Sequence, residues 1–124
     1  MHFPRKVRIV EVGARDGLQN ESVPVATATK LELIRRLSDS GLTHVEAASF
    51  VSPRWVPQMA DHREIMLALR DSHANSTTAK SATTYSALTP NMKGLEAALE
   101  CGVREVAVFG SASESFSQRN INCS

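Results

Sequence analysis

The chain has 124 residues, of which 42% are hydrophobic and 22% charged, and its formal net charge is +1. This length suits one globular domain or a piece of a larger one. The near-neutral charge gives no electrostatic case for a nucleic acid or an anionic membrane as partner. No stretch approaches the ~18–20 apolar residues that a membrane-spanning helix needs, and the N-terminus lacks a secretory or transit signal. We expect a cytoplasmic protein.

The two cysteines, Cys101 and Cys123, are too few to cross-link a small secreted scaffold. Each stands beside a segment with the pattern of regular structure. We therefore expect free thiols in a reducing compartment.

The first half of the chain contains two predicted strands with a helix between them. Residues 7–12 alternate with period two, are rich in β-branched side chains and stop at Gly13, which predicts a strand. A helix capped by Thr27 or Thr29 follows and ends near Gly41. The second predicted strand covers residues 43–48.

A proline-containing loop around Trp55 follows, and Asp61 offers a cap for the next helix, which carries Ile65 and Leu69. Residues 71–81 are rich in Ser, Thr and Ala without periodicity, which predicts a surface loop.

Two more strands and a helix are predicted in the second half. Residues 83–88 form the weaker strand, and a helix with Pro90 at its start follows and ends at Gly102. Residues 105–110 are nearly continuous in apolar side chains, so we expect a strand that is buried on both faces. Residues 117–123 lead towards another helix.

Strand and helix thus alternate four times, which predicts an α/β fold with parallel strands and excludes a helical bundle and a β-sandwich. The first strand is not followed by the glycine fingerprint of dinucleotide-binding domains. A complete (β/α)8 barrel needs about 200 residues or more, so four units correspond to half of one. We expect either the N-terminal part of a barrel or a chain that must associate to cover its strand edges.

Polar side chains follow three of the predicted strands, at the end where ligands meet parallel sheets. Arg15, Asp16 and Gln19 come after the first strand, Glu46 and Ser49 at the second, and Asn91 and Lys93 after the third. A carboxylate, a guanidinium and an amide within five residues can together hold a hard cation and the oxygens of an anionic substrate. The same residues are also compatible with an ordinary solvated turn.

Glu46 is flanked by apolar residues on its strand, so its carboxylate needs a partner in the interior. Arg15, at the end of the neighbouring strand, is the candidate. Spacing alone leaves a structural ion pair and a catalytic pair equally open. His44 and His62 lack the spacing of metal ligands and are interpreted as surface or capping residues.

Four motifs resemble the hydroxymethylglutaryl-CoA lyase family. They are VGARDGLQNE at 12–21, EAASFVSPRWVPQM at 46–59, LTPNMKG at 88–94, and VFG at 108–110 running to NINCS at 120–124. The likeness follows the chain in order over nearly its whole length. The SFVSP block with Trp55 separates the lyases from related condensing enzymes. The resemblance implies a (β/α)8 metallolyase barrel, of which residues 1–124 are the N-terminal part of a single domain.

The resemblance also implies a role for each site residue. Arg15 would polarise the thioester carbonyl of an acyl-CoA substrate, Asp16 would bind Mg²⁺ or Mn²⁺, and Glu46 would orient Arg15. Gln19 and Ser49 would line the substrate pocket, with Asn120 and Ser124 near the coenzyme A entrance. The implied reaction cleaves 3-hydroxy-3-methylglutaryl-CoA to acetyl-CoA and acetoacetate, a step of leucine breakdown.

The sequence departs from the family pattern in three ways. Ala14 replaces the usual proline, and the 71–81 segment is longer than usual. The family's His-x-His pair, its Asn ligand and its catalytic cysteine loop do not occur in these 124 residues. We therefore expect this chain alone to be inactive and to bind metal weakly. A condensing enzyme of the isopropylmalate or homocitrate synthase type, and a noncatalytic half-barrel, remain alternatives.

Overall fold

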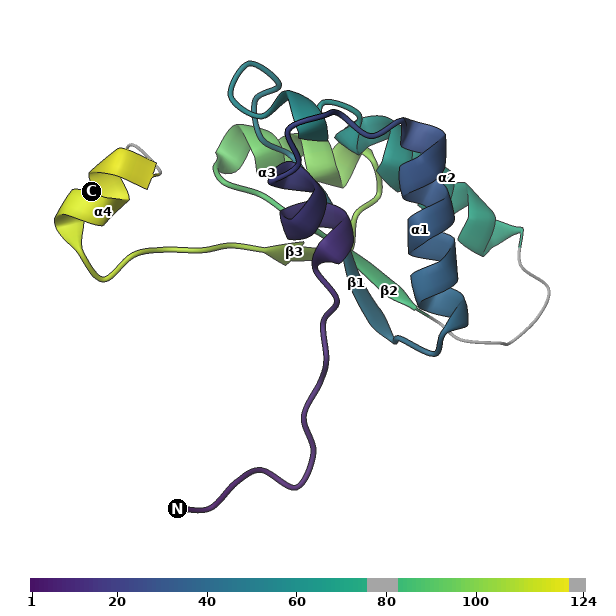
Figure 1. The fold of residues 1–124 in the computed structure, drawn as a ribbon, viewed down its shortest axis with the longest axis horizontal. Helices are drawn as coiled ribbons and strands as arrows, with labels where there is room; N and C mark the ends of the chain where they lie inside the picture. The colour runs from purple at the N-terminus through teal and green to yellow at the C-terminus, as the bar shows by residue number, and fades with distance from the viewer. Residues whose placement is uncertain (76–82, 121–124) are drawn as a thin grey trace.

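The computed structural model describes residues 1–75 and 83–120. Helical and extended segments alternate along the chain (Figure 1). Their order and bounds are η1 (Gly13–Gly17), α1 (Thr27–Asp39), β1 (His44–Ser49), η2 (Pro57–Met59), α2 (His62–Ala74), β2 (Thr84–Leu88), α3 (Met92–Glu100), β3 (Glu105–Ala107) and α4 (Glu114–Asn120).

The strands form a parallel sheet in the order β1-β2-β3, which confirms the predicted parallel α/β arrangement. His44 pairs with Thr84 at one end of β1, and Ser49 pairs with Leu88 at the other. Helices α2 and α3 cross between successive strands, as parallel connections require. The carboxyl ends of the three strands therefore meet at the same edge of the sheet.

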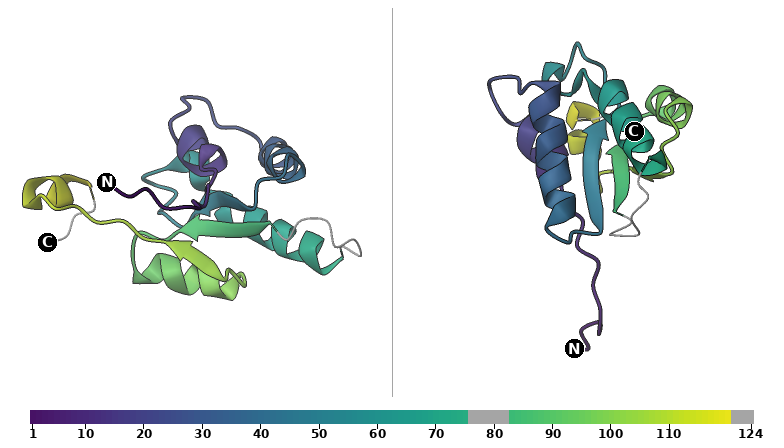
Figure 2. Two further views of the ribbon diagram at one scale, coloured as in Figure 1. Left: turned by 90° about the horizontal axis from the view of Figure 1, so that it is seen from below. Right: turned by 90° about the vertical axis from the view of Figure 1, so that its right-hand side faces the viewer.

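The core lies between the sheet and the helices that pack around it (Figure 2). Helices α1 and α2 both contact β1 and each other. Each presents apolar side chains at helical spacing, and Ile34 and Ile65 are buried in the same apolar core as Val45 of β1. These contacts fix β1 as the best-packed strand, with all residues from Val45 to Ser49 buried.

The predicted first strand is mostly wrong. Residues 7–10 are not paired, and within the described part of the chain only Glu11 joins the sheet, through an isolated parallel bridge to Val45. The side chains of Val7 and Ile9 are 69% and 64% exposed. The physical reason is that burial, and not the alternating pattern alone, stabilises a strand, and nothing in the described residues covers this segment.

The fourth predicted strand is shorter and more exposed than expected. Strand β3 ends at Ala107, and Val108 is 77% exposed. The expectation that residues 105–110 are buried on both faces is therefore wrong for this chain. The sheet of the described residues places β3 at its edge, next to β2 alone, so one side of the strand has no neighbour to cover it.

Several helix ends also differ from the predictions. Helix α2 runs to Ala74, so the predicted loop is helical over 71–74, and residues 76–82 lie outside the described part. Helix α4 begins at Glu114, three residues before the predicted segment. Thr27 and Asp61 stand at helix starts without capping them, because their side chains bond each other. Asn91, which follows Pro90, caps α3 by accepting from the Gly94 amide.

Gly94 allows the first turn of α3 to lie against the backbone that follows β1. A Cβ at this position would lie 2.6 Å from the carbonyl oxygen of Phe50, which is closer than real side chains come. The obstacle is backbone and cannot rotate away. Absence of a side chain at Gly94 thus sets the distance between α3 and the end of β1, where the polar residues gather.

Gly94→Ala is expected to destabilise the chain by about 1–3 kcal/mol, because overpacking forces the backbone to shift and outweighs the gain in helix propensity. Urea unfolding measures the change. Gly110→Ala is the matched control, since its Cβ would meet nothing within 4 Å, and it should alter the unfolding free energy by less than about 0.5 kcal/mol. Equal effects of the two variants would contradict the close contact.

Candidate functional site

A single wide helical turn, η1, follows Glu11 and presents the first group of polar residues. The Val12 carbonyl oxygen accepts hydrogen bonds from the amides of Asp16 at 2.7 Å and Gly17 at 3.3 Å. The carboxylate of Glu11 accepts from the Gly13 amide at 2.7 Å. Turns of this π type occur often at functional sites. Here the turn carries Arg15 and Asp16 beside β1.

Arg15 and Glu46 form a short ion pair between this turn and β1. The Nε of Arg15 donates to Oε1 of Glu46 at 2.5 Å, and the side chains are only 16% and 8% exposed. The expected pairing of Arg15 with Glu46 is confirmed. The Nη1 of Arg15 also donates to Oδ1 of Asp16 at 3.1 Å. The guanidinium therefore lies between two carboxylates from different segments.

This arrangement holds the guanidinium in one orientation and still leaves part of it available. Arginine has five N–H donors, and the Arg15 Nη2 group makes no hydrogen bond within residues 1–75 and 83–120. The three side chains carry one positive and two negative charges. Such a group can donate to an anionic oxygen through Arg15 and can attract a cation to Asp16, whose side chain is 56% exposed.

Two further predicted site residues have buried polar atoms without partners. Across the described residues, Oε1 of Gln19 and Oγ of Ser49 are buried and make no hydrogen bond. Ser49 ends β1 and is 1% exposed, and Gln19 follows η1. Buried polar atoms normally have partners, so unsatisfied ones need an explanation. A ligand that contacts both segments would supply it.

The donor set for a metal ion is partial. Asp16 offers an exposed carboxylate, as expected for a ligand of a hard cation. Among the residues that the structure describes, no group of three His, Cys, Asp or Glu side chains could hold a metal ion. Asp16 thus fits as one ligand, and the described residues do not provide a complete shell.

Other candidates are not brought to this group. Asn120 lies at the end of α4, which Figures 1 and 2 show apart from η1 beyond an extended segment. Ser124 and Cys123 lie outside the described residues, whereas Cys101 is a buried free thiol, as expected. His62 contacts the Met59 carbonyl through Nδ1 and packs on the ring of Phe50. It is the first residue of α2 and is partly buried by these contacts.

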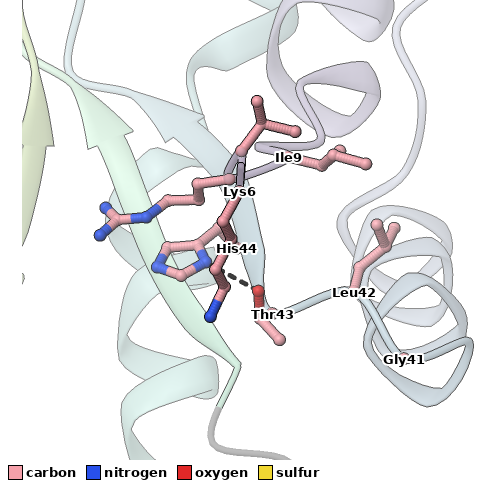
Figure 3. A pocket seen from close by; sticks show the side chains of 8 residues that line it. Lys6, Ile9, Gly41, Leu42, Thr43 and His44 are labelled. Atoms are coloured by element: carbon pink, nitrogen blue, oxygen red, sulfur yellow. Dashed lines mark hydrogen bonds between the residues drawn. The ribbon is translucent and has the colours of Figure 1, made fainter. Parts of the chain in front are cut away.

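A cavity of about 700 Å³ lies at the opposite end of β1 (Figure 3). Lys6 to Ile9 and Gly41 to His44 line it. Because β1 runs from His44 to Ser49, this cavity stands at its amino end, whereas Glu46 and Ser49 lie further along the strand. The cavity forms where residues 6–9 run unpaired past the start of β1, and it is separate from the candidate site.

Sequence reasoning missed a second buried ion pair. Lys30 of α1 is 3% exposed and bonds Asp61 at 2.7 Å. The available signal was a lysine four residues before the buried Ile34, on the same side of an amphipathic helix.

A double-mutant cycle with Arg15→Met and Glu46→Gln is expected to give a coupling energy of about 2–3 kcal/mol in urea unfolding, because each single variant leaves a largely buried charge without its partner. The matched control is the pair Arg35 and Asp39, which has the same 2.5 Å distance but is 59% and 62% exposed. That coupling should not exceed about 0.5 kcal/mol. Similar coupling for the two pairs would show that the Arg15 pair is solvated.

Comparisons with known proteins agree with this arrangement. The model of the HMGL-like family matches residues 6–124. A 3-hydroxy-3-isohexenylglutaryl-CoA/hydroxymethylglutaryl-CoA lyase of Pseudomonas aeruginosa is 56% identical over all 124 residues. The mitochondrial hydroxymethylglutaryl-CoA lyase of Gallus gallus is 53% identical over 98% of this chain. A cytoplasmic 3-hydroxy-3-methylglutaryl-CoA lyase of Mus musculus is 54% identical over the same share.

Solved structures of hydroxymethylglutaryl-CoA lyases have the same fold as this chain. The chain superposes on the hydroxymethylglutaryl-CoA lyase of Pseudomonas aeruginosa with a TM-score of 0.81, covering 100% of this chain and 39% of that one. It also superposes on a lyase from Acinetobacter baumannii, solved in complex with coenzyme A and 3-methylmalate, with a TM-score of 0.79 at 34% identity over 94% of this chain and 35% of that one.

The chain spans 39% of the length of the Pseudomonas aeruginosa relative and 38% of the Gallus gallus relative. The matched structures are TIM barrels, and the parallel sheet with its helices corresponds to their N-terminal part, as predicted from the strand and helix order. The chain therefore belongs to the HMGL-like family and has the fold of the N-terminal part of a hydroxymethylglutaryl-CoA lyase barrel.

Proposed function

We propose that the chain serves as the N-terminal part of a hydroxymethylglutaryl-CoA lyase, which cleaves 3-hydroxy-3-methylglutaryl-CoA to acetyl-CoA and acetoacetate in leucine breakdown and ketone-body formation. The observation that carries the proposal is the guanidinium of Arg15, held by Glu46 and placed beside Asp16. The family membership and the named lyase relatives support it.

Arg15 has the central role in this proposal. Cleavage of the bond between C2 and C3 leaves negative charge on the thioester oxygen of the forming acetyl-CoA enolate. A fixed guanidinium whose Nη2 group has no partner among the described residues can donate to that oxygen in the transition state, where such donors contribute most. Glu46 acts as the positioning residue, because its bond to Nε prevents rotation of the guanidinium.

Asp16 is proposed as one ligand of Mg²⁺ or Mn²⁺. When bound, such a cation polarises the tertiary hydroxyl of the substrate and favours loss of its proton. The Arg15 contact at 3.1 Å engages one carboxylate oxygen, and the Asp16 side chain remains 56% exposed. The remaining ligands would come from a part of the barrel beyond this chain.

Gln19 and Ser49 are proposed to contact the substrate, since their buried unpartnered oxygens lie on the two segments that flank the Arg15 group. Asn120 and Ser124 are proposed to lie near the coenzyme A moiety. The lyase of Acinetobacter baumannii binds coenzyme A together with a small hydroxy acid, which supports an acyl-CoA as the substrate class.

Residues 1–124 would form part of a single barrel domain that a C-terminal half completes. We propose that the isolated chain is inactive and associates through its exposed strand edges. No helix in the described ranges is long and apolar enough to cross a membrane. The named relatives include mitochondrial and cytoplasmic lyases, and we propose the cytoplasm for this protein.

The complete gene product that carries these residues should release acetoacetate and acetyl-CoA from hydroxymethylglutaryl-CoA in the presence of Mg²⁺. Arg15→Gln should lower kcat by roughly 10²–10³-fold, the effect of removing one donor to a developing oxyanion. Arg54→Gln is the control, because Arg54 is exposed, and its kcat should stay within about twofold. Condensation of acetyl-CoA with an oxoacid, in place of cleavage, would contradict the proposal.

Residues 1–124 expressed alone should sediment as a species heavier than the monomer, since Val108 and Phe109 leave apolar surface exposed beside β3. Replacing both with Ser should shift the distribution towards the monomer. The experiment is run at about 50 μM, a concentration at which exposed strand edges associate. A folded monomer of the unmodified chain under these conditions would contradict association through this edge.

A further inference from the structure

Helix α1 carries a buried lysine where an apolar residue would ordinarily stand. Lys30, Ile34 and Leu37 follow one another at spacings of four and three residues and therefore lie on the same side of the helix. Ile34 is 0% exposed and Lys30 only 3%. Burying an ammonium group away from water costs free energy unless the group is paired. The partners of Lys30 therefore indicate what this charge contributes to the fold.

The Lys30 ammonium joins three segments. It donates to Oδ1 of Asp61, at the start of α2, at 2.7 Å, and to the backbone carbonyl of Gln58 in η2. The other carboxylate oxygen of Asp61 accepts from the hydroxyl of Thr27 at 2.8 Å. The positive and negative charges are balanced, and the starts of α1 and α2 are fixed to η2.

Gln58 extends this contact to the candidate site. Its side-chain Nε2 donates to the carbonyl oxygen of Glu21 at 2.9 Å. The Glu21 amide donates in turn to the Leu18 carbonyl at 3.2 Å, and Nδ2 of Asn20 donates to the Asp16 carbonyl at 2.8 Å. Two hydrogen bonds thus connect the buried ammonium to the end of the segment that carries Arg15, Asp16 and Gln19.

We propose that Lys30 is a positioning residue for the lyase site: paired with Asp61, it fixes Gln58, and Gln58 holds the end of the 13–21 segment in place. The inference rests on the proposed function for its catalytic consequence, whereas the holding itself concerns only residues of this chain. A buried pair retained only for stability is replaceable by neutral side chains of similar size, often without loss. A positioning role predicts that such a replacement keeps the free energy of unfolding but does not keep the 13–21 segment in place.

Two variants of the complete gene product separate these roles. Lys30→Met with Asp61→Asn removes both charges and leaves an acceptor for the Thr27 hydroxyl, whereas Gln58→Met removes only the bond to Glu21 and leaves the buried pair intact. Lys6→Met is the control, because Lys6 is exposed and makes no ion pair within the described part of the chain. Urea stability, amide exchange at Asn20 and Glu21, and kcat for hydroxymethylglutaryl-CoA are measured for each variant.

Both test variants should have a free energy of unfolding close to that of the unmodified protein. Their Asn20 and Glu21 amides should exchange at least about tenfold faster, because local opening becomes easier. Their kcat should fall by roughly 10–100-fold, because Arg15 and Asp16 are misplaced. The control should match the unmodified protein in all three. Unchanged exchange and kcat in the charge-free variant would overturn the proposal. If the unmodified protein does not cleave the substrate, the proposed function fails, and amide exchange alone then decides the positioning role.

Discussion

The ion pair between Arg15 and Glu46 is the contact on which the candidate site depends. Among the described residues, a single bridge between Glu11 and Val45 pairs the first segment with the sheet, and Ala14 of η1 is buried in the core. The side chain of Arg15, bonded to Glu46 at 2.5 Å, adds a third connection between this segment and β1. The pair is mostly shielded from water, so it is screened little by salt. Removing Arg15 would leave Glu46 as an uncompensated charge on a buried strand, whereas removing Glu46 would leave Arg15 with the exposed carboxylate of Asp16.

The rest of the structure places these two residues. Packing of α1 and α2 against β1 buries Glu46 on its strand, and η1 turns the chain so that Arg15 returns to it. Gly94 lets α3 approach the end of the same strand. The buried Lys30 pair then fixes the far end of the 13–21 segment through Gln58. Helix packing and two separate ion pairs thus hold one short polar segment from both sides.

Much of the fold could be predicted from the sequence, because helices α1 to α3 and strands β1 and β2 combine the expected periodicity with real burial. The 7–12 and 105–110 segments have an equally clear pattern, yet the structure leaves Val7 and Val108 exposed. An alternating sequence pattern indicates which face of a strand is suited to burial. It does not indicate whether another strand or helix is present to cover that face. In a complete barrel, the remaining part of the domain would supply that neighbour. This chain covers 39% of the Pseudomonas aeruginosa structure that it matches.

The residues of the candidate site could be predicted from the sequence, whereas the contacts that hold them in place could not. Arg15, Asp16 and Glu46 share one sheet edge, which follows from the parallel order of the strands. The oxygens of Gln19 and Ser49 that have no partner in the described part of the chain are found only from three-dimensional burial. Lys30 and Asp61 are 31 positions apart, and sequence spacing does not reveal pairs between different helices.

The most direct measurement of the central contact is the NMR signal of the Arg15 Nε proton. With the bond from Nε to Glu46 in place, this proton should exchange slowly with water at neutral pH, because it is hydrogen-bonded and largely buried, and Glu46→Gln should make exchange much faster. The exposed Arg54 provides the fast reference. Exchange of the Arg15 proton at the rate of Arg54 would contradict the account.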